Sequence, residues 1–132
     1  MIEEILSNPY YFILGSEAAD AGFTAFNMHI NSPNVEAVRS LRERVEEKGI
    51  VKGLLPSVLL TTGILTGLTY GAHLIDERFG INISGINVQD VVVYGIGGLK
   101  YLFGGIHLLQ GTVGLISENA RNFFREHPPF DY

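Results

Sequence analysis

Four side chains that can carry charge or transfer protons lie in otherwise apolar stretches of this 132-residue chain. They are Glu17, Asp20, Lys100 and His107. Ionisable groups in such segments are expensive to bury, so they must be paired, protonated or directed into a polar cavity. They point either to an ion or proton path, to contact with a ligand, or to a buried polar contact that fixes how two helices align.

The spacing of these groups predicts which of them pair. Glu17 lies eight residues into the segment 9–30, and Lys100 lies nine residues into the segment 91–116. If both segments are helices that run in the same direction, a rise of about 1.5 Å per residue places the two side chains at similar depth. Asp20 lies one turn further along. We therefore expect Lys100 to pair with Glu17 or Asp20, and His107 to act as a hydrogen-bonding neighbour.

Other chemistry finds little support. The chain has no cysteine, and it contains no nucleophile elbow, phosphate-binding loop, HExxH sequence or EF-hand loop. His29 and His107 would both lie toward the inner half of the membrane, roughly 6 Å apart in depth, but no short metal-ligand spacing supports a haem or metal site there. We therefore expect no catalytic residues, no enzymatic activity, no metal, and no cofactor other than bound lipid.

Composition excludes several classes of protein. Hydrophobic residues make up 46% of the chain, charged residues make up 17%, and the net charge is -5. A disordered chain would be more charged and less apolar, and a nucleic-acid-binding protein would usually be basic. We expect no nucleic-acid partner.

Two segments are long and apolar enough to cross a bilayer. Residues 53–75 contain no charged residue, and residues 91–116 contain Lys100 as the only one. A third candidate, residues 9–30, is interrupted by Glu17 and Asp20. We predict an all-α integral membrane protein in which residues 1–132 form a single membrane domain with three transmembrane helices. The alternative is a soluble helical module that binds an apolar ligand.

The segments outside the three spans have their own signals. Residues 33–48 read as a short amphipathic cytoplasmic helix at the membrane interface, with Ser32 as N-cap and Gly49 as the stop. The tail, residues 118–132, begins as a short helix that Pro128-Pro129 would end.

Basic residues predict the orientation in the membrane. With three spans, seven positive residues fall on one side and Arg78 alone falls on the other. The seven are Arg39, Arg42, Arg44, Lys48, Lys52, Arg121 and Arg125. The positive-inside rule then places the N-terminus outside and the C-terminus in the cytoplasm.

Glycines recur at helical spacing in two of the spans. Residues 53–75 contain two overlapping GxxxG units, and residues 91–116 carry a stripe with alternating spacings of three and four. The first set is Gly63, Gly67 and Gly71; the second is Gly97, Lys100, Gly104, His107, Gly111 and Gly114. Small residues on one face allow close backbone approach, so both faces are predicted to pack against protein.

The sequence therefore predicts a structural or accessory subunit of a membrane-embedded assembly. The assembly would be a homo-oligomer, a larger complex or a virion envelope, with other membrane chains and the lipid bilayer as partners. A small transporter, channel or proton path that uses Glu17, Asp20, Lys100 and His107 is the second hypothesis.

Overall fold

The computed structural model describes residues 2–36 and 38–127, and within these residues the fold is helical and contains no strand. The prediction of an all-α protein is confirmed. In chain order the elements are α1 (Ile2–Ser7), α2 (Pro9–Ile30), the 3-10 turn η1 (Pro33–Val35), α3 (Arg39–Lys48), α4 (Ile50–Phe79), α5 (Val88–Ile116) and α6 (Glu118–Glu126).

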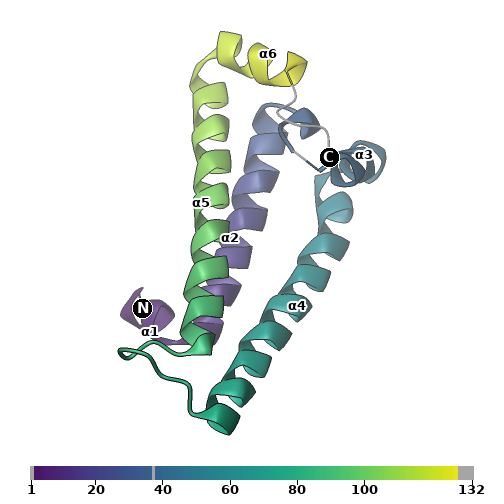
Figure 1. The fold of residues 1–132 in the computed structure, drawn as a ribbon. Coiled ribbons are helices and arrows are strands. Elements are labelled where there is room, and N and C mark those ends of the chain that lie inside the picture. Colours follow the sequence, from purple (N-terminus) through teal and green to yellow (C-terminus); the bar gives the residue numbers. More distant parts are fainter. Residues whose placement is uncertain (1, 37, 128–132) are drawn as a thin grey trace.

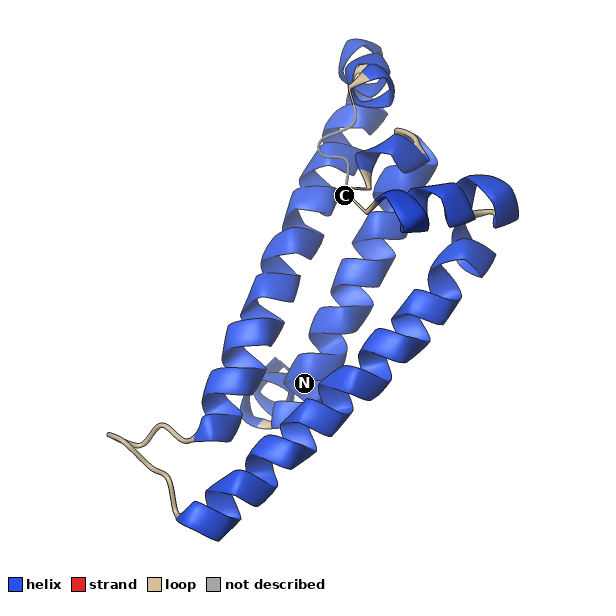
Figure 2. Ribbon diagram, turned by 45° about the vertical axis from the view of Figure 1, so that its right-hand side comes forward, coloured by secondary structure: helices blue, strands red, loops and turns tan. Residues whose placement is uncertain are grey.

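Three long helices set the shape of the molecule (Figure 1). α2 and α5 lie side by side and run in the same direction, while α4 runs opposite to both and diverges from α5. The short helices α3 and α6 cross the same end of the bundle, as the rotated view in Figure 2 also shows.

Two of the described helices, α4 and α5, are long and apolar enough to cross a membrane. The prediction of three such helices is therefore wrong in its count, because α2 does not qualify. α2 has a sufficient length of 22 residues, but its sequence includes two carboxylates. Its buried residues include Ser16, Glu17, Thr24 and Asn27. The face of α2 that packs against the protein is thus polar, which lowers its average hydropathy.

The predicted helix over residues 33–48 begins later than expected. Pro33–Val35 form a 3-10 turn, and α3 starts at Arg39 after Val38, which has an extended backbone. Ser32 is therefore not the cap of this helix. The reason is tertiary packing: Val35 is buried in a cluster with Met28 and Leu54, and the chain must turn there to lay α3 across the bundle end.

Two helices end at glycine residues, as the sequence favours. Gly49 separates α3 from α4 with a φ of +88°, and Gly80 caps α4 in the left-handed region with a φ of +60°. Such angles are strained for residues that carry a Cβ atom. The predicted stop at Gly49 is therefore where the chain changes direction.

The carboxylate of one residue, Asp76, connects the end of α4 to the start of α5. Asp76 near the end of α4 accepts hydrogen bonds from the backbone N–H groups of Val88 and Gln89, at 2.8 and 2.9 Å. Asn87 caps α5 and forms a reciprocal capping box with Asp90. The first-turn N–H groups of α5 thus find partners on both helices.

Buried apolar clusters are small, and the apolar surface is extensive. One buried cluster contains Met28, Val35, Val45 and Leu54, and another contains Ile13, Leu65 and Val93. Many large apolar side chains of α4 and α5 are exposed in the isolated chain: Val51, Leu55, Leu59, Leu60, Ile64, Leu68, Leu74, Ile75, Leu99, Leu102, Phe103, Leu109, Leu115 and Ile116. A soluble monomer rarely exposes so continuous an apolar surface.

The tail begins as α6, as the sequence predicts. Its expected end at Pro128-Pro129 lies outside the described residues.

Candidate functional site

The contact between α2 and α5 repeats every seven residues. A Cβ atom placed on Gly97, Gly104 or Gly111 would meet, in turn, Ile13, Asp20 and Asn27, each seven residues after the last. A repeat of seven residues keeps one face of a helix directed at its neighbour along the whole contact. The predicted glycine stripe of α5 therefore faces α2 of the same chain.

The glycines of this stripe make room for particular groups. A Cβ atom on Gly104 would lie 3.1 Å from Cα of Asp20, so the two backbones are close together there. A Cβ atom on Gly114 would overlap the side-chain amide of Asn31. At Gly97 the space is filled by the ring of Phe12, which makes edge contacts with Tyr94 and Tyr101 at centroid distances of 4.8 and 5.2 Å.

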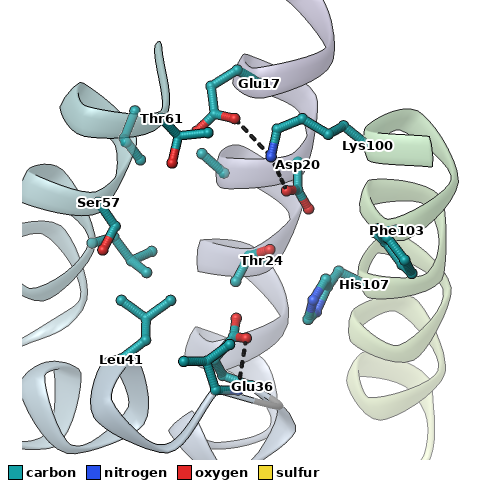
Figure 3. Close-up of a pocket in the computed structure, with 14 residues that line it drawn as sticks. Glu17, Asp20, Thr24, Glu36, Leu41, Ser57, Thr61, Lys100, Phe103 and His107 are labelled. Carbon is teal, nitrogen blue, oxygen red and sulfur yellow. Dashed lines mark hydrogen bonds and ion pairs between the residues drawn. The ribbon is translucent and has the colours of Figure 1, made fainter. Parts of the chain in front are cut away.

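The same face brings three charged groups together. Lys100 Nζ lies 2.8 Å from Glu17 Oε2 and 2.9 Å from Asp20 Oδ2 (Figure 3). The ammonium group thus contacts both carboxylates at once, where the sequence argument expected one partner. We call Glu17, Asp20 and Lys100 the charged triad.

The charged triad is poorly accessible to solvent. The side chains of Glu17 and Lys100 are 8% and 18% exposed, and that of Asp20 is 24% exposed. Charges withdrawn from water need partners, because their desolvation costs several kcal/mol per ion. Lys100 supplies that partner, but one positive charge cannot neutralise two negative ones.

About two helical turns beyond the triad, α2 and α5 are joined by amides and an imidazole. Asn31 Nδ2 donates to the backbone carbonyl of Gln110 at 3.0 Å and to Asn27 Oδ1 at 2.6 Å. Asn27 Nδ2 lies 2.8 Å from Gln110 Oε1 and 2.9 Å from His107 Nδ1. We call Asn27, Asn31, His107 and Gln110 the amide network.

The amide network fixes the tautomer of His107. A backbone carbonyl can only accept, so the Asn31 group that contacts it must be the NH₂. Asn27 then presents its oxygen to Asn31 and its NH₂ to His107. The Nδ1 atom of His107 must therefore accept, which makes the ring neutral, with its proton on Nε2.

The triad and His107 line one cavity between α2, α4 and α5, and Glu36, Val38 and Leu41 also line it. Its volume is about 620 Å³. Figure 3 shows Ser57 and Thr61 of α4 across the cavity from His107 of α5. The lining residues are Glu17, Asp20, Ala21, Thr24, Glu36, Val38, Leu41, Leu54, Ser57, Val58, Thr61, Lys100, Phe103 and His107. All four ionisable residues singled out from the sequence thus border the same space.

The glycines of α4 have a different environment. A Cβ atom added to Gly63, Gly67 or Gly71 would meet no atom within 4 Å. The glycine of α4 that does make a close contact is Gly53, where a Cβ atom would lie 2.7 Å from Cα of Val45 in α3. The repeated GxxxG face is therefore open within this chain.

Sequence reasoning missed two parts of the site. Glu36 lies outside the predicted spans and gave no signal of its own, yet it lines the cavity. Asn31, the C-cap of α2, was also missed; it follows Asn27 by four residues, and this spacing could have indicated that it shares the polar face of α2.

The histidines do not form an evident metal centre. Among residues 2–36 and 38–127, no group of three or more His, Asp or Glu side chains is arranged to hold a metal ion. His29 is exposed on α2, and the Nδ1 atom of His107 is engaged with Asn27. These contacts give no support to a haem site that uses both.

Comparison with protein-family models, curated proteins and solved structures finds no match to this chain.

Proposed function

We propose that this protein is a small integral membrane protein that acts as a structural or accessory subunit of a larger assembly. The observation that carries the proposal is the open face of α4. Gly63, Gly67 and Gly71 repeat at intervals of four, and a Cβ atom added to any of them would meet no other part of residues 2–36 and 38–127 within 4 Å. Such a face permits close packing of a second helix in a membrane, where small residues favour association.

We also propose that α2 is a third transmembrane helix. In this arrangement α5 covers the polar face of α2 and separates it from lipid. An isolated α2 would expose two carboxylates to lipid at a cost of several kcal/mol. Against α5, its carboxylates contact Lys100, and its amides contact His107 and Gln110. Its polar groups are then largely withdrawn from the surface that lipid would contact.

The distribution of basic residues supports an orientation with both α3 and α6 at the cytoplasmic side. These two helices cross the same end of the bundle (Figure 1). Arg125 of α6 also donates a hydrogen bond to the carbonyl of Asn31 at the end of α2. The predicted cytoplasmic segments thus form one end, and the α4–α5 turn forms the other.

Measurement of native mass in a mild, uncharged detergent tests the subunit role. We expect the full-length chain to form a complex of more than one chain, and Gly67→Leu to reduce the mass. Gly105→Leu is the matched control, because Gly105 of α5 also has no neighbour within 4 Å but lies outside the GxxxG repeat. A wild-type chain that is monomeric and purifies from its own membrane without companions would refute the proposal.

A small transporter, channel or proton path is the second candidate. It is favoured by the presence of Glu17, Asp20, Lys100 and His107 around one cavity. Flux measurements in proteoliposomes test it: Asp20→Asn should abolish ion or proton movement that the wild-type chain supports. Wild-type vesicles no leakier than empty ones would exclude this role.

A further inference from the structure

We propose that the cavity between α2, α4 and α5 is a binding site for an amphipathic organic cation. The proposal depends on the cavity alone. It holds whether the chain acts as a subunit of an assembly or as a path for ions or protons. At about 620 Å³, the cavity falls within the usual size range of sites for small organic molecules.

The charge of the lining determines the charge of the ligand. Three carboxylates line the cavity, from Glu17, Asp20 and Glu36, against the single ammonium of Lys100. His107 adds no charge, because its Nδ1 accepts a hydrogen bond from Asn27. The lining therefore carries two more negative charges than positive ones, and this excess favours a cation.

Positive groups near the rim reduce this excess without cancelling it. Arg44 of α3 donates a hydrogen bond to Ser57 Oγ at 3.1 Å, although Arg44 does not itself line the cavity. Counting this guanidinium still leaves the site with a net negative charge.

The negative groups lie at separate ends. Glu17 and Asp20 border the cavity at the end near Thr61, and Glu36 borders it at the end near Leu41 (Figure 3). A cation placed between them interacts with both ends at once. Lys100 already compensates the triad in part, so Glu36 contributes the charge that is least balanced inside the cavity.

The remaining lining is largely apolar and suits a ligand with organic substituents. Leu41, Leu54 and Val58 provide aliphatic surface, and Phe103 provides an aromatic ring. A small hydrated metal ion would leave this apolar surface unused, whereas an organic cation would cover it.

Titration calorimetry of the detergent-solubilised full-length chain with tetraphenylphosphonium tests the proposal. Tetraphenylborate is the comparison, since it has nearly the same size and shape and the opposite charge. After subtraction of the heat from empty micelles, we expect saturable binding of the cation at one site per chain. The anion should bind at least about ten-fold more weakly.

Two variants of equal net charge locate the binding. Glu36→Gln removes a carboxylate from the cavity, and we expect it to weaken cation binding by about ten-fold. Glu46→Gln removes a carboxylate from the exposed part of α3, so cation binding should be unchanged. Glutamine keeps a side-chain oxygen that can accept the hydrogen bond from the backbone N–H of Val38, as Glu36 does at 3.2 Å.

The comparison of cation with anion on the wild-type chain stands even if Glu36→Gln does not fold. Absence of saturable cation binding, equal binding of the anion, or an equal loss in both variants would each overturn the proposal. Failure of the subunit role would appear as a monomeric mass instead, with cation binding intact.

Discussion

Gly104 lies directly against the backbone of Asp20: a Cβ atom there would be 3.1 Å from Asp20 Cα and 3.2 Å from Asp20 N. Backbone atoms cannot move aside as a flexible side chain can. Gly104 thus holds α2 and α5 close enough for Lys100, one turn earlier on α5, to contact both carboxylates. Close helix approach and charge pairing are consequences of the same glycine.

Gly104→Ala should therefore destabilise the chain, because the new methyl group would push α2 away. We expect a decrease in the free energy of unfolding of about 1–3 kcal/mol, the usual cost of overpacking. Gly105→Ala is the adjacent control, with no neighbour within 4 Å. It should be neutral or slightly stabilising, since alanine favours helix over glycine by about 1 kcal/mol. Thermal unfolding in detergent measures both, and equal melting of the two variants would contradict the packing argument.

Lys100→Met should destabilise the chain by leaving two carboxylates close together without a cation. Loss of one partner of a buried ion pair costs about 3–5 kcal/mol. The triple variant Glu17→Gln/Asp20→Asn/Lys100→Met removes all three charges and should recover much of that loss. Lys52→Met, at an exposed position on α4, is the control for removing a lysine. Unchanged unfolding of Lys100→Met would mean that the charged triad contributes nothing to the fold.

The amide network predicts the protonation of the His107 ring. In the wild-type chain, ¹⁵N NMR should report a neutral ring with a proton on Nε2 and none on Nδ1. Asn27→Asp replaces the NH₂ that contacts Nδ1 with an oxygen, so a proton should appear on Nδ1. His73, which lies near Glu77 on α4, should give the same spectrum in both proteins. A wild-type ring protonated on Nδ1 would show that the network is oriented differently.

Asp76→Ala should weaken the joint between α4 and α5. The variant loses the acceptor for the backbone N–H groups of Val88 and Gln89, and loss of a helix-capping group costs about 1 kcal/mol. Hydrogen exchange at Val88 and Gln89 should accelerate, while exchange in the middle of α5 should not. Glu77→Ala is the control, because Glu77 is exposed beside Asp76 and contacts His73 on its own helix. Similar exchange rates in both variants would show that Asp76 does not protect the backbone N–H groups of Val88 and Gln89.

Local sequence signals predicted the three long helices, but they did not predict α1 (Ile2–Ser7). Segment 9–30 coincides with α2, and the apolar runs at 53–75 and 91–116 lie within α4 and α5. These signals depend on length, hydropathy and the nearest capping residues. The start of α3 could not be predicted in the same way, because it depends on burial of Val35 against Met28 and Leu54 from other elements.

The sequence indicated part of the candidate site, but neither Glu36 and Asn31 nor the shape of the cavity. The spacing of Gly97, Lys100, Gly104 and His107 marked the face of α5 that contacts α2. Whether another helix or another chain would cover a glycine face was not encoded locally. The sequence therefore did not indicate that α2 covers the α5 face, or that the similar α4 face is left open. The cavity depends on the angle at which α4 leaves the other helices, a property of the whole chain.

The pairing of α2 with α5 bears on the order in which the chain can be assembled. Asp20 and Lys100 are 80 residues apart in sequence, so α2 is synthesised well before its partner exists. Until α5 emerges, the carboxylates and amides of α2 have no acceptable place in lipid. In the proposed three-span arrangement, entry of α2 into a bilayer would follow, or coincide with, that of α5, and a chain interrupted before Lys100 would leave α2 at the water interface.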